Sequence, residues 1–402
     1  MTSATDLRVR VISGMGQVAA AEWNRIAAES APPNPATDFS GNQYNPFVSH
    51  EFLSALEVSE SATARTGWLP QHLLIENAEG HVMGAAPCYL KSHSRGEYVF
   101  DHGWAEAYEH AGGRYYPKLQ VSVPFTPVMG PRLLAKADSS VDAVRQALTI
   151  GLVELCRLRG ASSAHLTFLT REEWQLLGAR GFLQRTDQQF HWENAGYGTF
   201  EDFLAALAAR KRKAIRRERR HAIPAGTSIE WLTGSDLTES AWDAFFGFYM
   251  DTGSRKWGRP YLTRPFFSLV GESMRDHILL IMAKRAGRYI AGALNFIGSG
   301  TLYGRHWGAI EHHLFLHFEI CYYQAIEFAI AKRLARVEAG AQGEHKLSRG
   351  YLPVTTYSAH HIADRGLRRA IDDYLRRERA YVEAAREELG AMAPFRKVAL
   401  EN

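Results

Sequence analysis

Apolar and polar residues alternate with two periods along this chain, and each period predicts one type of element. A period of two predicts strands, and a period of about 3.6 predicts helices with one apolar face. In the first half, we expect strands at 7–12, 72–75, 82–89, 97–101, 164–169 and 188–192, and helices at 18–28, 51–57, 140–159 and 171–179. In the second half, we expect strands at 228–232, 278–283, 289–296, 301–306 and 337–346, and helices at 237–250, 263–274, 316–336 and 366–389. Segment 102–134, rich in aromatic residues, glycine and proline, is expected to be ordered loop.

The order of these elements repeats, and short strings repeat with it. HLLI at 72–75 corresponds to ILLI at 278–281, VMGAA at 82–86 to IAGAL at 290–294, and YVFDHGWA at 98–105 to LYGRHWGA at 302–309. The spacings differ by two or three residues, so chance agreement of short apolar strings is the alternative explanation. We interpret the repeat as a duplicated α/β domain (1–196 and 197–402) with mixed central sheets and a charged C-terminal helix. Asp101 and Arg305–His306 then take matching places, where they either face an inter-domain cleft or are structural.

The amino-acid composition indicates an ordinary globular protein. The chain has 402 residues, 46% of them hydrophobic and 22% charged, with a net charge of +4 and three cysteines. These are ordinary globular values, and the few cysteines give neither a disulfide framework nor a CxxC zinc pattern. No apolar leader and no run of about 18 apolar residues is present, so we expect a cytoplasmic protein, with peripheral membrane contact as the alternative. His313 and His317 are spaced as metal ligands, but no third ligand follows at a useful spacing, so no metal is expected.

The segment 303–351 concentrates groups that could perform chemistry. Glu319 is a candidate general base, because a carboxylate near the start of an apolar helix has its pKa raised by burial; alternatively it serves the helix dipole. Tyr323, one turn further, is a candidate acid or an aromatic core residue. His317 is a candidate ligand contact or a packed histidine, since it does not share a helix face with Glu319.

The string GAQGEHK supplies the remaining candidates. On a strand, Gln342, Glu344 and Lys346 point to one face, and the glycines around them suggest a ligand close to the backbone. Lys346 or Arg349 could hold a carbonyl oxygen or a phosphate. The alternative is an internal salt bridge between Glu344 and Lys346.

The run RKRKAIRRERR at 210–220 lies on an expected helix, 200–221. Phe203, Leu204, Leu207 and Ile215 could form its buried stripe and leave the charges in solvent. The functional alternative is contact through Arg210–Arg220 with a phosphate-rich partner: tRNA, the phosphates of coenzyme A, or an anionic membrane surface.

Strand, helices, antiparallel meander, helix and strand is the element order of the GNAT acyltransferase fold, and two such domains in tandem resemble the FemAB-like family. The strings that carry the resemblance are VFDHGWA (99–105), YYPKL (115–119), PFTPVMGPRLL (124–134), YGRHWG (303–308), LHFEICYYQAIEFAI (316–330) and GAQGEHKLSRGYLP (340–353). The glycine-rich loop with which many GNATs hold the pyrophosphate of acetyl-CoA is absent from 308–316.

The resemblance implies an N-acyltransferase that moves an acyl or aminoacyl group from a thioester or an aminoacyl-tRNA to an amine. The acceptor would be a cell-wall precursor or a lipid. It implies no tightly bound cofactor, with acyl-CoA or aminoacyl-tRNA as co-substrate. Two alternatives remain: a non-catalytic GNAT scaffold that binds cell-wall or lipid ligands, and an RNA-binding module that uses the basic helix.

Overall fold

Two β-sheets organise the chain. The computed structural model describes residues 7–30, 44–138, 140–223, 225–257, 260–340 and 343–396. Four strands form the smaller sheet, in the order β1 (Arg8–Ile12), β3 (His72–Glu76), β4 (Val82–Ala86), β7 (Leu134–Ala135). Eleven strands form the larger sheet, in the order β10 (Thr227–Leu232), β11 (Ile278–Arg285), β12 (Arg288–Ile297), β13 (Thr301–Ala309), β14 (Arg336–Glu338), β9 (Leu183–Glu193), β15 (Leu352–Ile362), β8 (Ser163–Leu169), β6 (Lys118–Val121), β5 (Cys88–Lys91), β2 (Trp68–Pro70).

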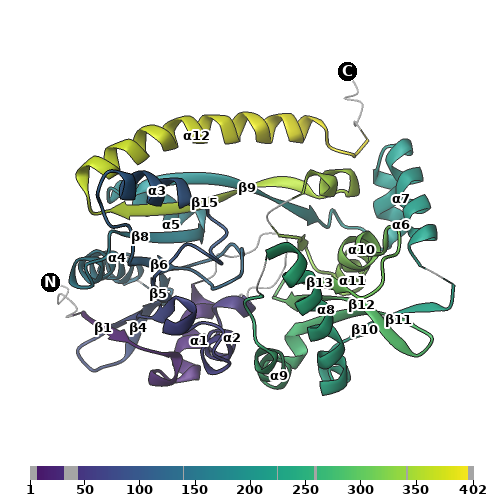
Figure 1. Ribbon diagram of the computed structural model, residues 1–402, viewed down its shortest axis with the longest axis horizontal. Helices are drawn as coiled ribbons and strands as arrows, with labels where there is room; N and C mark the ends of the chain where they lie inside the picture. Colours follow the sequence, from purple (N-terminus) through teal and green to yellow (C-terminus); the bar gives the residue numbers. More distant parts are fainter. Residues whose placement is uncertain are drawn as a thin grey trace.

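Helices cover both sheets, and Figure 1 shows their arrangement. The helices of the first half are α1 (Ala20–Glu29), α2 (His50–Val58), α3 (His102–His110), α4 (Val141–Leu158), α5 (Arg171–Ala179). Those of the second half are α6 (Phe200–Ala206), α7 (Ala209–Ala222), α8 (Glu239–Trp257), α9 (Arg264–Ser273), α10 (Leu316–Phe318), α11 (Gln324–Ala331), α12 (Arg365–Ala391). None of the described helices is long and apolar enough to cross a bilayer.

The large sheet joins the two halves of the chain. β15 comes from the second half, yet it pairs antiparallel with β8 and β9 of the first half along its length. α12 then lies along β9 and β15 (Figure 1), and its Leu367, Ile371 and Leu375 share one buried cluster with Trp104 of α3. The predicted division at residue 197 stays a prediction, but the last strand and the last helix lie on the first half.

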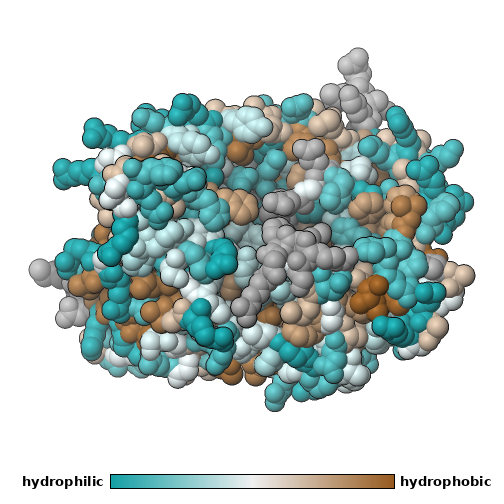
Figure 2. Space-filling model, in the orientation of Figure 1, coloured by the Kyte–Doolittle hydropathy of each residue, from teal (hydrophilic) through white to brown (hydrophobic). Residues whose placement is uncertain are grey.

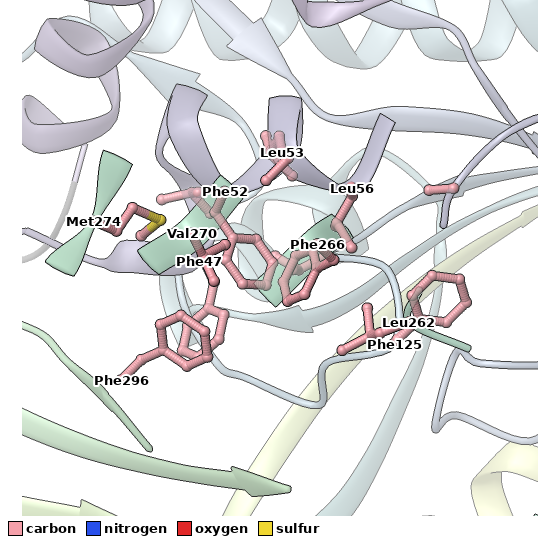
Figure 3. Packing of buried hydrophobic residues seen from close by; sticks show 14 of the residues in the cluster. Phe47, Phe52, Leu53, Leu56, Phe125, Leu262, Phe266, Val270, Met274 and Phe296 are labelled. Carbon is pink, nitrogen blue, oxygen red and sulfur yellow. The ribbon is translucent and has the colours of Figure 1, made fainter. Parts of the chain in front are cut away.

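Aromatic residues pack the two halves against each other (Figure 3). Phe52 of α2 contacts Phe266 of α9, with 5.6 Å between ring centroids. Phe47 contacts Phe296 of β12 at 5.1 Å. All four side chains are almost fully buried. Burying a phenylalanine contributes roughly 2 kcal/mol, so this cluster fixes the relative position of the halves and of anything bound between them.

The surface differs from this interior. Most residues on the face shown in Figure 2 are hydrophilic, and the hydrophobic ones form separate small areas.

Gly308 illustrates how closely the interior packs: a methyl group there would lie 2.2 Å from the carbonyl oxygen of Phe248. Only glycine lets α8 approach β13 this closely.

Several predicted elements are wrong in type or extent. Residues 97–101 form no strand, and 102–134 contains α3, β6 and β7 rather than loop alone. The single helix expected at 316–336 is interrupted by a π-helical turn, Glu319–Tyr323, and ends at Ala331. The strand expected at 337–346 ends at Glu338, and a 3-10 helix, Glu344–Arg349, follows. The basic helix expected at 200–221 is two helices with a break at Leu207 and Ala208, where Leu207 is extended and bridges to Phe395.

Candidate active site

A gap between two parallel strands creates a cavity. β13 and β14 pair over three residues only, Thr301–Tyr303 with Arg336–Glu338. β13 continues to Ala309, whereas β14 ends at Glu338, so the sheet opens beyond this point. The opening holds a cavity of about 630 Å³. Hereafter we call it the β13 cavity.

Both halves of the chain line the β13 cavity, and seven of its lining residues are aromatic. The aromatic lining residues are Tyr98, Phe100, Phe125, Tyr249, Tyr261, Trp307 and Tyr322. Phe125 and Tyr261 stack across the halves, with ring centroids 4.8 Å apart. No aspartate or glutamate belongs to the described lining, which instead carries Arg305, Lys346 and three histidines. The aromatic rings therefore favour an apolar ligand. The cations favour a ligand that also carries a negatively charged or carbonyl oxygen.

Lys346 is a buried cation that pairs with no described carboxylate. The residue is 3% exposed, and its Nζ donates to the carbonyl oxygen of Gly340 at 2.9 Å. Burial, and then the nearby Arg305, lowers the pKa of Lys346 to about 8. A lysine with this pKa can hold a proton at neutral pH and also release it.

Arg305 is the second cation of the β13 cavity. Its Nη1 donates to the carbonyl oxygen of Gly304 at 2.8 Å, and its Nη2 lies 3.4 Å from Glu338. Its buried Nε has no hydrogen-bond partner among the described residues. Burial lowers the pKa of Arg305, although Glu338 opposes the shift. A guanidinium in a cavity wall is suited to hold an oxyanion.

Two predicted histidines line the β13 cavity as well. His306 forms no hydrogen bond with any described residue, and its ring lies 5.1 Å from that of Tyr249. Burial lowers its pKa to about 4, so its imidazole is neutral at pH 7. His317 lies between aromatic rings, 5.2 Å from Trp307 and 5.4 Å from Tyr322.

Glu319 lies outside this lining. Its side chain is fully buried, and its carboxylate accepts hydrogen bonds from Arg219 Nη2 at 2.7 Å and from Gln324 at 2.8 Å. Arg219 also pairs with Glu327. Glu319 thus ties α7 to the π-helical turn, and its predicted role as general base stays a prediction.

Two further predicted residues meet each other elsewhere. The Tyr323 hydroxyl donates to Glu218 of α7, and Arg349 Nη2 donates to the same carboxylate at 2.8 Å. Both belong to a second cavity, described below. Their predicted roles as acid and as ligand contact also stay predictions.

Asp101 is buried in the first half and is not among the lining residues of the β13 cavity. It accepts from Lys118 at 2.5 Å and from the Tyr115 hydroxyl at 2.7 Å. Burial alone would raise the pKa of Asp101, but Lys118 holds it well below its usual range. Asp101 precedes α3, whereas Arg305 and His306 lie on β13, so the matching places proposed from the repeat are not equivalent in the structure.

The strand face expected to unite Gln342, Glu344 and Lys346 does not form. Gln342 lies outside the described residues, and Glu344 opens the 3-10 helix with a side chain that is not described. Period-two reasoning fails here because the two glycines at 340 and 343 adopt positive φ angles, 80° and 114°, which turn the chain. The turn directs Lys346 into the cavity from a helix.

Sequence reasoning missed most of the aromatic wall. Tyr98, Tyr249 and Tyr261 come from three distant segments, and each looks like an ordinary core residue in its own segment. The density of aromatic residues in 102–134 signalled packing but not a cavity. Only the fold brings these rings together.

Comparison with known proteins places the chain in a family. The FemAB-like family model, described as peptidoglycan biosynthesis/recognition, matches residues 14–397. The chain belongs to the FemAB-like family. Membership supports a transferase role and confirms the resemblance seen in the sequence. The search of the curated proteins found no match.

Solved structures with the same fold include FemX, at 12% identity and a TM-score of 0.54, over 88% of this chain and 98% of that chain. A tandem GNAT protein from the clavulanic acid biosynthesis pathway aligns at 11% identity and a TM-score of 0.45, over 89% and 99%. A conserved protein of unknown function from Bacteroides thetaiotaomicron VPI-5482 aligns at 12% identity and a TM-score of 0.49, over 88% and 99%. The FemX likeness confirms the tandem GNAT fold of this FemAB-like protein.

Proposed function

We propose that this FemAB-like protein is an N-acyltransferase and that transfer takes place in the β13 cavity. The observation that carries the proposal is the pair of buried cations, Lys346 and Arg305, in an aromatic cavity whose described lining has no carboxylate. Acyl transfer passes through a tetrahedral intermediate with a negative oxygen, and fixed cations in a dry site stabilise that charge.

In the proposed reaction, the acceptor amine attacks the donor carbonyl carbon. A C–N bond forms, and the C–S bond of a thioester or the C–O bond of an aminoacyl ester breaks. The neutral imidazole of His306 takes the proton that the amine loses, and Lys346 protonates the leaving group. The proton returns from His306 to Lys346 through solvent.

The walls of the β13 cavity indicate the kind of acceptor. Seven aromatic side chains suit an apolar chain or a stacked ring. Among the acceptors that the family suggests, a lipid-linked amine fits this lining, whether it belongs to a cell-wall precursor or to a membrane lipid. The donor is a thioester or an aminoacyl-tRNA.

A donor-binding screen tests the proposal. Thermal shifts with acetyl-CoA, long-chain acyl-CoA and bulk tRNA report binding to the folded state. We expect one donor class to raise the melting temperature. Lys346→Met should reduce the shift, and Lys332→Met, which removes an exposed lysine at the end of α11, should not. Equal shifts in both variants would contradict placement of the donor in the β13 cavity.

A second candidate function, RNA binding, is favoured by α7 itself. Its Lys213, Arg217 and Arg220 are exposed and form no ion pair with a described residue. The triple change of these residues to serine should abolish salt-dependent binding of tRNA if RNA binding is the function. Unchanged affinity would remove it.

A further inference from the structure

A second cavity, of about 370 Å³, lies between α7, the π-helical turn and the 3-10 helix Glu344–Arg349. We call it the α7 pocket. Neighbouring residues face the two cavities: Tyr322 lines the β13 cavity and Tyr323 the α7 pocket, and Lys346 lines the first and Arg349 the second. The π-helical turn and the 3-10 helix therefore form a wall shared by both cavities.

The α7 pocket has an excess of positive charge. Arg210, Lys211 and Arg349 line it, together with one acid, Glu218. Arg210 and Lys211 form no ion pair and no hydrogen bond with described residues, so their charges are unbalanced. Glu218 is already occupied, because it accepts from Arg349 Nη2 through both oxygens, at 2.8 and 2.9 Å, and from the Tyr323 hydroxyl.

Arg349 is the buried cation of the α7 pocket. Its side chain is 6% exposed, and its guanidinium lies 3.5 Å from the centroid of the Phe318 ring, which fixes its plane. Nη1 donates to the carbonyl oxygen of His345 at 2.7 Å, while the buried Nε has no partner among the described residues.

We propose that the α7 pocket binds a phosphomonoester or pyrophosphate group through Arg210, Lys211 and Arg349. A doubly charged phosphate group balances the two unpaired cations, and its oxygens match the fork of an arginine. The concave shape admits a terminal group rather than a continuous nucleic acid backbone. The site goes beyond the transferase activity proposed above and stands whether or not that activity is found.

Binding in the α7 pocket would also act on the β13 cavity. Arg349 and Lys346 belong to one 3-10 helix, Glu344–Arg349. A phosphate group held by Arg349 would stabilise this helix and so the position of Lys346. Hydrogen exchange in residues 345–351 should slow when the pocket is filled.

Calorimetric titration with inorganic pyrophosphate tests the site without any need for turnover. Arg210→Ser/Lys211→Ser should weaken binding on the order of 10-fold, because two of the three cations are lost. Lys213→Ser/Arg217→Ser removes the same charge from the same helix but no residue of the pocket, and should change affinity by no more than about 2-fold. Circular dichroism confirms that both variants fold.

Further ligands distinguish a soluble phosphate ester from a lipid headgroup, and two results would overturn the proposal. Tighter binding of adenosine 3′,5′-bisphosphate indicates a soluble phosphate ester, and tighter binding of vesicles with phosphatidic acid indicates a lipid headgroup. Either result supports the site if Arg210→Ser/Lys211→Ser loses the binding and Lys213→Ser/Arg217→Ser keeps it. An equal loss of pyrophosphate binding in the matched variant would show general attraction to α7 and overturn the proposal. Absence of pyrophosphate binding by the unchanged protein would overturn it too.

Discussion

Lys346→Met should make the protein more stable at neutral pH while removing its proposed activity. The fold opposes the charge on Lys346, whose pKa falls from 10.5 to about 8. Each pKa unit corresponds to about 1.36 kcal/mol, so the charged form costs the folded state about 3 kcal/mol below pH 8. The variant also loses the hydrogen bond from Lys346 to Gly340, which reduces this gain in stability by about 1 kcal/mol. Methionine keeps the apolar stem, so the net gain is about 2 kcal/mol.

The stabilisation expected from Lys346→Met depends on pH. Between pH 8 and pH 10.5 the folded protein has released the Lys346 proton and the unfolded chain still binds it, so the stability of the unchanged protein rises with pH relative to the variant. The gain from Lys346→Met should therefore shrink as pH rises through this window. Urea unfolding at pH 7 and pH 9.5, followed by tryptophan fluorescence, measures it, with Lys332→Met as control. A variant less stable at pH 7, or a gain that does not shrink by pH 9.5, would refute the reasoning.

Three other perturbations test separate parts of the structure. Arg219→Met leaves the buried carboxylate of Glu319 without its cation and should lower the free energy of unfolding by about 3 kcal/mol in a denaturant titration. Adding Glu319→Gln to this variant should restore part of the lost stability. No recovery would contradict the pairing. Gly308→Ala should lower stability by about 2 kcal/mol or more, because its methyl group meets the α8 backbone, and an unchanged melting temperature would argue against that contact. Asp101 stabilises the fold above its ordinary pKa, and this contribution should be lost as pH falls below about 4; acid unfolding of Asp101→Asn should lack that step.

The sequence predicted elements better than their assembly. Two of the three repeated strings, at 72–75 with 278–281 and at 82–86 with 290–294, lie on corresponding strands. The third does not, because the chain at Asp101 enters α3 while Arg305 stays on β13. Local alternation cannot show this difference, since burial of Asp101 with Lys118 depends on distant residues.

The site was predicted in part for a similar reason. Lys346, Arg305, His306 and His317 do line one cavity, although Lys346 was expected on a strand and lies on a 3-10 helix. The buried apolar stripe expected for the basic run, including Phe203 and Ile215, is confirmed, yet the ion pair between Arg219 and Glu319 could not be read from charge patterns. β15 was missed entirely, because its core contacts lie in the first half of the chain.

Product formation tests the central claim most directly. The protein would be incubated with long-chain acyl-CoA or charged tRNA and a mixture of lipid-linked amines, and amide products would be identified by mass spectrometry. We expect a new amide from the unchanged protein, a loss of at least about 100-fold in rate with Lys346→Met, and full activity with Lys332→Met. Equal product from Lys346→Met would contradict transfer in the β13 cavity.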